Sequence, residues 1–201
     1  MTGMDSQTVV SVSRRSANAS RLLNWVFHLL CLVLAIGLLW ESSSPGTTAS
    51  VLLLFVLLAS LAVAWLIAVI VTLVVQRRLR WWMAVAPLGG LLVMLLLSAN
   101  VPLHVRWAGS QDAFAAALAS PDFGTATNGD GYLSPPVQVG TFEIIGFSRD
   151  GDRAQFDDSS SFCGTSGFAY LPGGDPSVIG GGDATNSVDL GDAWFAFEVP
   201  C

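Results

Sequence analysis

The sequence predicts an α-helical membrane region of three transmembrane helices, followed by a small α+β or mainly β extracytoplasmic domain. Two observations carry this prediction. Three long apolar runs occupy residues 22–99, and from residue 100 to residue 201 the chain becomes acidic and rich in turn-forming residues. We expect residues 1–21, which precede the first run, to form a disordered cytoplasmic tail.

The apolar runs have the length that a membrane crossing needs. They cover residues 22–40, 51–75 and 81–99, which are 19, 25 and 19 residues long. A hydrocarbon core of about 30 Å is crossed by roughly 20 helical residues, so each run predicts one spanning helix. Pro87 and the two glycines that follow it are expected to kink the third helix without ending it.

The placement of arginine predicts the orientation of these helices. The loop 41–50 contains no basic residue, so the positive-inside rule puts the N-terminus in the cytoplasm and residues 100–201 outside the plasma membrane. A cleaved signal peptide is disfavoured, because its apolar stretch has only about 7–15 residues, and it would leave this outside location unchanged. Six of the nine basic residues lie in the tail or between runs two and three: Arg14, Arg15, Arg21, Arg77, Arg78 and Arg80.

The second half of the chain is strongly acidic. Between residues 100 and 201, thirteen Asp or Glu residues stand against three Arg, a net charge of −10. Nucleic acid requires a basic surface, and anionic lipid attracts basic segments, so neither suits this region. The expected partners are the lipid bilayer, through the helices, and another membrane or envelope protein, with no nucleic acid.

Two cysteines lie in the half that is predicted to be outside. Thiols oxidise there, so we expect Cys163 and Cys201 to form a disulfide. On the chain-entropy model, closing a loop over their separation of 38 positions would stabilise the domain by about 4 kcal/mol. An intermolecular bridge and free thiols stay open as alternatives. Cys31 lies inside the first run, where a thiol behaves as a small hydrophobic group.

Local patterns predict a mostly β domain after the membrane region. Residues 103–107 form a short alternating stretch, and Ser110 has the residue type of an N-cap for a helix 110–120 that Pro121 ends. Asp150-Gly151 predicts a hairpin turn. The predicted strands cover residues 137–147, 153–156, 167–171 and 193–199. A long loop, residues 172–191, is predicted between the last two strands.

No motif for a reaction stands out, and we predict no catalytic, cofactor-binding or metal-binding residue. The four aspartates between 150 and 158 lack the closing glutamate of a calcium loop and indicate a charged hairpin. Ser166 is followed directly by Gly167, whereas a nucleophile elbow has one residue between them. Hydrolysis by two carboxylates would need an acidic pair about 5–10 Å apart in a cleft, and the sequence singles out no pair.

Asn24 and His28 form a possible intramembrane polar site. They lie one turn apart on one face of the first predicted helix, where they can hydrogen-bond to neighbouring helices or line an ion path. Helix packing is the preferred interpretation, because a path normally needs several polar stations. On the second helix, Ser60, Ala64 and Ala68 form a stripe of small residues that another helix can approach closely.

Several short motifs of the second half occur together. They are Leu103-His104-Val105-Arg106-Trp107, Ser110 with Phe114, Val139-Gly140, Gly167-Phe168-Ala169-Tyr170 with Pro172-Gly173 and Pro176, and Asp192-Ala193-Trp194-Phe195. In this combination the chain resembles a set of uncharacterised membrane proteins of high-GC Gram-positive (actinobacterial) bacteria, which have apolar N-terminal helices and an extracytoplasmic C-terminal domain. The resemblance implies a shared fold and no known activity. The two outer cysteines are not part of it.

The sequence therefore predicts a non-catalytic integral membrane protein that presents an extracytoplasmic interaction or ligand-binding domain. Two alternatives stay open. One is an accessory subunit of a membrane transporter or small-ion conductor, organised around Asn24 and His28, and the other is an extracytoplasmic carboxylate-dependent hydrolase. Aromatic residues are candidates for the binding surface, although most are expected in the core: Trp107, Tyr132, Phe168, Tyr170, Trp194 and Phe195.

Overall fold

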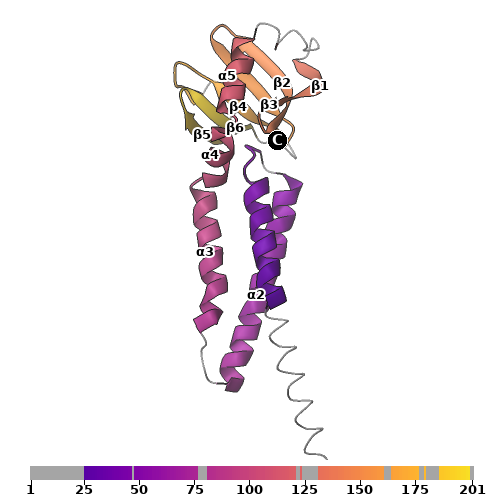
Figure 1. Cartoon of the computed structure of the whole chain (residues 1–201), viewed down its shortest axis with the longest axis vertical. Helices are drawn as coiled ribbons and strands as arrows, with labels where there is room; N and C mark the ends of the chain where they lie inside the picture. The colour runs from indigo at the N-terminus through magenta and orange to yellow at the C-terminus, as the bar shows by residue number, and fades with distance from the viewer. Residues whose placement is uncertain are drawn as a thin grey trace, which may run out of the picture.

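The structure, a computed structural model, describes residues 25–46, 48–76, 81–120, 123, 131–160, 164–176, 179 and 186–199. A helical N-terminal region stands at one end of a sheet domain, as Figure 1 shows. The helices are Trp25–Glu41, α2 (Ala49–Gln76), the 3-10 helix η1 (Trp81–Ala84), α3 (Val85–Ser98), α4 (Val101–Ala108) and α5 (Gln111–Ala119). The strands are β1 (Tyr132–Val139), β2 (Phe142–Asp150), β3 (Arg153–Asp158), β4 (Thr165–Tyr170), β5 (Asn186–Gly191) and β6 (Trp194–Val199).

One helix of full span length is present in the described residues. The segment Ala49–Val75 of α2 is long and apolar enough to cross a membrane, and α3 with α4 would be a second span if this pair, bent by 58°, counts as one broken helix. The helix Trp25–Glu41 is apolar but shorter within the described residues. The three predicted runs thus appear as helices, of which one or two reach span length.

The sharp bend lies after the third run and not at its proline. Pro87 occupies the first turn of α3, where the missing N–H has no helical partner to lose, and α3 continues through both glycines to Ser98. Asn100 adopts the left-handed conformation, with φ of 51°. An asparagine tolerates this conformation better than most residues, so the chain changes direction here.

Residues 103–107 are helical, and their interpretation as a short alternating stretch was incomplete. Leu103 and Trp107 lie one turn apart on α4 and are buried, whereas Val105 between them is 69% exposed. Side chains four residues apart share a helix face, while those two apart lie on nearly opposite sides. In this stretch the spacing of four was the informative one.

All six strands form one antiparallel sheet in the order β1-β2-β3-β4-β6-β5. Strand formation at 153–156, 167–171 and 193–199 is confirmed by β3, β4 and β6. The predicted strand 137–147 is in fact two strands, because the chain turns at Gly140 with φ of 61°. An added Cβ there would lie 2.5 Å from Cβ of Ser110, so close packing as well as backbone conformation favours glycine.

The predicted loop 172–191 also contains a strand. Its last six residues form β5, which pairs with β6 at the sheet edge. The strand carries Asn186, Ser187, Asp189 and Gly191, residue types that are depleted in strands or neutral there, and this explains why the sequence did not predict it. Cross-strand pairing with the aromatic strand β6 stabilises it instead.

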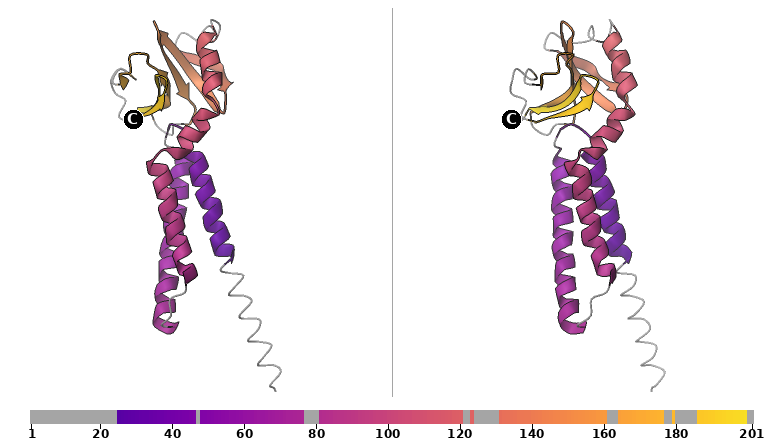
Figure 2. Two further views of the ribbon diagram at one scale, coloured as in Figure 1. Left: turned by 60° about the vertical axis from the view of Figure 1, so that its left-hand side comes forward. Right: turned by 90° about the vertical axis from the view of Figure 1, so that its left-hand side faces the viewer.

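The main core lies between the sheet and α4 with α5, which cover one face (Figure 2). Phe114 of α5 is fully buried at its centre. Five rings lie 4.9–6.0 Å from its ring, measured between centroids: Trp107, Phe142, Phe156, Phe168 and Trp194. Such spacing is typical of aromatic packing that adds to the gain from area burial. A second, smaller cluster on the opposite face contains Ala169, Leu171, Ile179, Phe195 and Phe197.

The predicted N-cap of the α5 helix has a different role. Ser110 directly precedes α5, but its side chain makes no capping hydrogen bond. Its Oγ accepts the N–H of Thr141 at 3.1 Å and lies 3.0 Å from Thr141 Oγ1. The hydroxyl therefore joins the start of α5 to the β1–β2 turn.

Candidate functional site

Arg106 of α4 connects the helical region to the sheet domain. Its guanidinium donates to Ser43 Oγ at 3.2 Å and to Ser44 Oγ at 2.9 Å, both in the loop that follows the first helix. It also donates to Thr141 Oγ1 at 3.1 Å and to the carbonyl oxygen of Thr141 at 2.5 Å, in the β1–β2 turn. We call Arg106, Ser43, Ser44 and Thr141 the Arg106 junction, because they tie three separate segments together.

The charge of Arg106 is partly buried and balanced. Its guanidinium carbon lies 4.2 Å from the ring centroid of Phe142 and 5.6 Å from that of Trp40, distances suited to cation–π attraction. Burial lowers the pKa of Arg106, while the negative charges of Asp158 and Glu41 act in the opposite direction. Arginine stays charged under all such conditions, so the junction carries a permanent positive charge.

Four polar residues form a row across the sheet beside this junction. Asp158 of β3 pairs with Ser166 of β4, Ser166 with Glu198 of β6, and Glu198 with Asn186 of β5. Directly paired residues in antiparallel strands point to the same face. Phe156 and Phe168 lie two positions along β3 and β4, so this polar row shares the face that packs on α4 and α5.

The inner half of the polar row is deeply buried. Asp158 is 5% exposed, and burial raises its pKa; the hydrogen bond from Ser160 Oγ at 2.6 Å and the charge of Arg106 partly oppose this rise. Ser166 is fully buried, and its Oγ has no hydrogen-bond partner among the described residues. A buried hydroxyl without a partner is uncommon, because desolvation costs about 1–3 kcal/mol.

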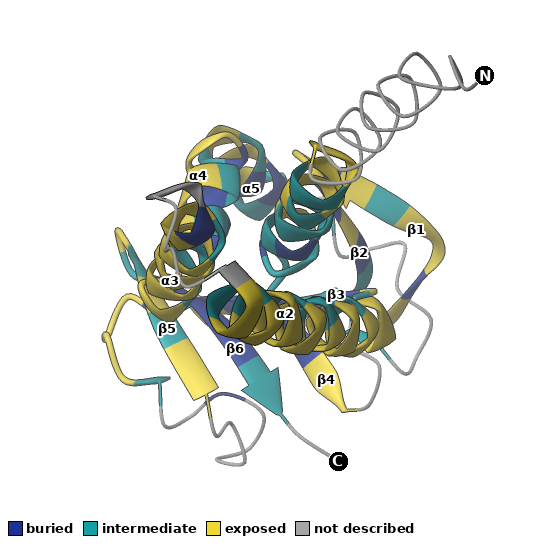
Figure 3. Cartoon of the chain, turned by 90° about the horizontal axis from the view of Figure 1, so that it is seen from below, coloured by how far each residue is buried: buried dark blue, intermediate teal, exposed yellow. Residues whose placement is uncertain are grey.

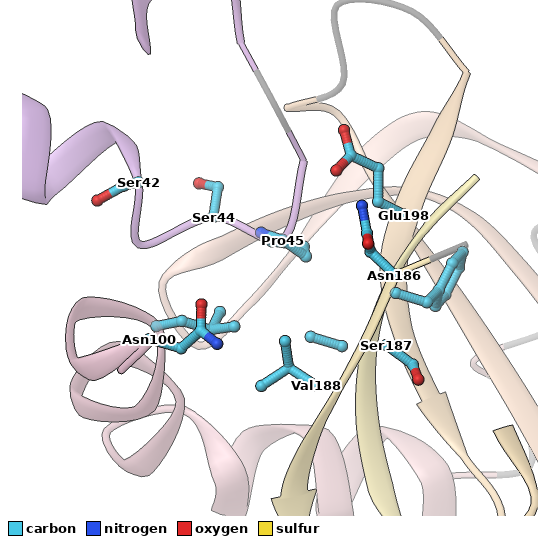
Figure 4. Close-up of a pocket in the computed structure, with 11 residues that line it drawn as sticks. Ser42, Ser44, Pro45, Asn100, Asn186, Ser187, Val188 and Glu198 are labelled. Atoms are coloured by element: carbon cyan, nitrogen blue, oxygen red, sulfur yellow. The ribbon is translucent and has the colours of Figure 1, made fainter. Parts of the chain in front are cut away.

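The outer half of the row lines a cavity of about 540 Å³. Figure 4 shows Asn186 and Glu198 close together on one wall, with Asn100 on the other and Pro45 between them. The cavity thus lies where the first interhelical loop, the bend between α3 and α4, and the ends of β5 and β6 meet. Its volume falls in the range of about 300–1,000 Å³ that small-molecule sites occupy. The polar residues of its lining are Ser42, Ser44, Asn100, Asn186, Ser187 and Glu198.

The cavity has an acidic character. Glu198 is the one charged residue among those that line it in the described part of the chain. The side-chain amides of Asn100 and Asn186 make no hydrogen bond with other described residues, which leaves them available to a ligand. This set of a carboxylate, amides and hydroxyls offers hydrogen bonds and one negative charge.

The polar row also bears on carboxylate chemistry. Asp158 and Glu198 lie two strands apart, which corresponds to about 10 Å at the usual strand spacing. Ser166 fills the position between them and is fully buried. A substrate therefore has no access to the space between the two carboxylates in this arrangement.

Most sequence-predicted site residues lie outside this region. Asn24, Cys163 and Cys201 are outside the described residues, so the intramembrane pair and the disulfide stay predictions. His28 is half-buried on the first helix, and its ring packs edge-on against Phe27 at 5.6 Å.

The remaining candidates are distributed between core and surface. Trp107, Phe168, Trp194 and Phe195 are buried, so they belong to the core, while Tyr132 is 58% exposed. Of the four aspartates, the first two lie at the β2–β3 turn and the last two within β3 on opposite faces. On the second helix, the side chains of the small-residue stripe at Ser60, Ala64 and Ala68 are exposed.

Sequence reasoning missed the Arg106 junction and the polar row. A usable signal was present for Glu198, because the alternation of Trp194, Ala196 and Glu198 placed a carboxylate on the same strand face as a tryptophan. A charged residue at an inward position of a strand is unusual unless it is partnered or functional. Nothing in the sequence indicated that β5 would bring Asn186 beside it.

No family model, curated protein or solved structure matches this chain. The resemblance to actinobacterial membrane proteins therefore remains a prediction.

Proposed function

We propose that this chain is a non-catalytic integral membrane protein of the plasma membrane. Its helices hold an extracytoplasmic ligand-binding domain against the outer face of the plasma membrane. The observation that carries the proposal is the apolar surface of the helical region. Viewed from the helix end, α2 and α3 are exposed along most of their length (Figure 3). In water such a surface would be strongly unfavourable, whereas lipid solvates it.

The dimensions of the helices support a bilayer location. The 28 residues of α2 extend over about 42 Å, which exceeds a hydrocarbon core of about 30 Å and allows for tilt. The 18 residues of η1 and α3 together reach about 29 Å. With the first helix, the chain has three apolar segments for the three predicted crossings, and the arginine pattern favours a cytoplasmic N-terminus.

The Arg106 junction supports a domain that is held in place and not merely tethered. Two of its partners lie in the loop after the first helix and the third in the sheet domain, so the contacts resist rotation of the domain about the α3–α4 bend. A cavity that lies between the two regions then keeps its shape at the membrane surface. We favour binding over hydrolysis because the buried Ser166 separates the two carboxylates of the polar row.

Topology labelling in intact cells tests the location. The three native cysteines are replaced with serine, and a single cysteine is introduced either as Tyr132→Cys, at an exposed position of β1, or as Ser13→Cys, in the predicted cytoplasmic tail. A membrane-impermeant thiol reagent is expected to label the first variant in intact cells and the second only after permeabilisation. Labelling of Ser13→Cys in intact cells with protection of Tyr132→Cys would reverse the topology and overturn the proposal.

The native cysteines provide a second route if the cysteine-free chain does not accumulate. In the Cys31→Ser background, Cys163 and Cys201 are expected to react with the same reagent in intact cells only after mild reduction. Reaction before reduction would support the outside location but argue against a disulfide. Reaction only after permeabilisation would place residues 100–201 in the cytoplasm and remove the ligand-binding role that depends on the outer surface.

A further inference from the structure

We infer that the cavity binds a primary ammonium group, carried by a ligand whose far end is rich in oxygen. Two sources present this chemistry at a membrane surface: a phospholipid with an ethanolamine headgroup and a free amino alcohol. This inference rests on the proposed function for its location, and it deepens that function by naming the ligand class.

The first step is the sign of the charge. Glu198 is the one charged residue of the cavity lining within the described part of the chain. Outside the lining, the charges of Asp158 and Glu41 act on Arg106. Arg106 is already directed at the junction, where it donates to Ser43, Ser44 and Thr141. The carboxylate of Glu198, which also keeps an interaction within the chain, therefore makes its wall of the cavity suit a cation more than an anion.

The second step is the shape of the cation. An ammonium group carries N–H donors that point in several directions. It therefore needs several hydrogen-bond acceptors around one point. The carboxylate of Glu198 and the side-chain amide of Asn186 lie close together on paired strands, as Figure 4 shows, and each has an oxygen that can accept a hydrogen bond. Charge-assisted hydrogen bonds of this kind are roughly twice as strong as neutral ones. A quaternary ammonium group lacks N–H donors and is usually held by an aromatic cage.

No such cage is present in the lining that the structure describes. Phe197 is its single aromatic residue, and it is 1% exposed and packs in the smaller core on the opposite face of the sheet. A trimethylated ammonium group would contact no aromatic ring face here, and it could not donate hydrogen bonds to the acceptors. The cavity consequently discriminates a primary ammonium group from a choline headgroup.

The third step is the opposite wall. Asn100 has an unbonded side-chain amide there, and Ser44 accepts a hydrogen bond from Arg106, which leaves its hydroxyl hydrogen to donate. Donors on this wall suit phosphate or hydroxyl oxygens. Because Ser44 lies in the loop that follows an apolar helix ending at Glu41, this wall is expected at the level where headgroups begin.

The test uses the full chain in lipid nanodiscs of three compositions: phosphatidylcholine alone, with phosphatidylethanolamine, and with phosphatidylglycerol. The readout is the thermal unfolding temperature, followed by tryptophan fluorescence. In a separate arm, phosphatidylcholine nanodiscs are titrated with free ethanolamine. The variants are Glu198→Gln, which removes the charge at constant shape, and Asn186→Leu, at an exposed position that tolerates change. Asp152→Asn, in the exposed β2–β3 turn, is the matched control for loss of one acidic charge.

We expect phosphatidylethanolamine or free ethanolamine to raise the unfolding temperature of the native chain and of Asp152→Asn. The Glu198→Gln variant should lose this rise, with affinity for free ethanolamine weakened about tenfold or more, since a hydrogen bond to a charged group contributes that much. A response to the lipid alone identifies a headgroup as the source, and a response to free ethanolamine identifies a soluble amine.

Three results would overturn the inference: no rise above phosphatidylcholine-only discs with either ammonium source, an equal rise in Glu198→Gln and Asp152→Asn, or an equal rise with phosphatidylglycerol and phosphatidylethanolamine discs without response to ethanolamine. If Glu198→Gln fails to fold, Asn186→Leu carries the same comparison. The topology labelling is independent of these outcomes. A failed ammonium test with labelling from outside leaves the membrane-anchored domain intact and removes only the ligand class.

Discussion

The helical region and the sheet domain use apolar residues in opposite ways. On α2, large aliphatic side chains such as those of Leu53 and Ile67 are 61% and 57% exposed, while in the sheet domain Phe114 and Phe156 are fully buried. Both regions are rich in apolar residues, so hydrophobicity alone does not separate them. The difference teaches that burial explains the apolar residues of the sheet domain, whereas the exposed apolar helices are what the proposal of lipid surroundings rests on.

Residue type follows this division. The helices are built from leucine, valine, isoleucine and alanine without a polar face, which costs nothing when the surroundings are also apolar. In the sheet domain, aromatic rings instead gather on one face of the sheet, and α4 and α5 cover that face. A compact domain of this size needs such large rings to bury sufficient area.

The largest expected effect comes from removing the centre of the sheet-domain core. Phe114→Ala should lower the free energy of unfolding by about 3–5 kcal/mol, because five aromatic rings lose their contact and a cavity remains. Urea unfolding of the full chain in detergent, followed by tryptophan fluorescence, measures it. Tyr132→Ala, at an exposed position of β1, is the control and should change stability by less than about 0.5 kcal/mol. Equal losses in both would remove the distinction between core and surface.

The helical region, by contrast, could be predicted from sequence almost directly. A run of aliphatic residues such as 51–75 is consistent with few structures other than an apolar helix, so its local pattern was sufficient. The break at Asn100 was not predicted, since a single left-handed residue leaves no periodic signal. Within the sheet domain the aromatic strands were found, whereas β5 was missed because its stability comes from pairing with β6.

The candidate site was beyond sequence reasoning for a similar reason. The Arg106 junction joins Ser43, Arg106 and Thr141, which are far apart in the chain and individually ordinary. The polar row likewise depends on strand order, and the placement of β6 between β4 and β5 cannot be read from local patterns. Only the inward position of Glu198 was visible in the alternation of β6.

A charge on the outward face of α2 is expected to have the next largest effect. Val63 is 58% exposed near the middle of the apolar segment, so Val63→Lys should cost about 2.5–3.5 kcal/mol of membrane insertion. The measurement is the fraction of chain in the membrane pellet after alkaline extraction. Gln138→Lys, on an exposed strand position opposite Glu143, is the matched control and should insert normally. Normal insertion of Val63→Lys would indicate that this face of α2 contacts water or protein.

The junction between the two regions should give an intermediate effect. Arg106→Gln removes the guanidinium that reaches Ser44 and Thr141, and we expect the sheet domain to lose about 1.5–3 kcal/mol of stability. Proteolysis in the α4 segment should become faster, because the domain would no longer be held to the first interhelical loop. Arg153→Gln, an exposed arginine at the β2–β3 turn, is the control. If both variants resist protease equally, the two regions are coupled by other contacts.

The smallest effect concerns a carboxyl group on the sheet face away from α5. Burial raises the pKa of Asp157, although the hydrogen bond from Gln155 Nε2 at 2.8 Å partly opposes this rise. A raised pKa means that the folded chain binds this proton more tightly than the unfolded chain. The contribution to stability is therefore full below the ordinary Asp pKa of about 3.9 and is lost as pH rises through the folded value.

Asp157→Asn keeps the size of the side chain and removes the titration. Relative to that of the native chain, its free energy of unfolding should become larger as pH rises from about 3.9, the ordinary Asp pKa, and then level off, with a total gain below the loss in Arg106→Gln. Urea unfolding across this pH range measures the difference, and Asp152→Asn at the exposed turn controls for charge. A flat difference would mean that water reaches Asp157 in solution, and the sheet face away from α5 would then be less sealed than the aromatic core. In that case, the contrast between exposed apolar helices and a buried sheet would hold only for the sheet face that α4 and α5 cover.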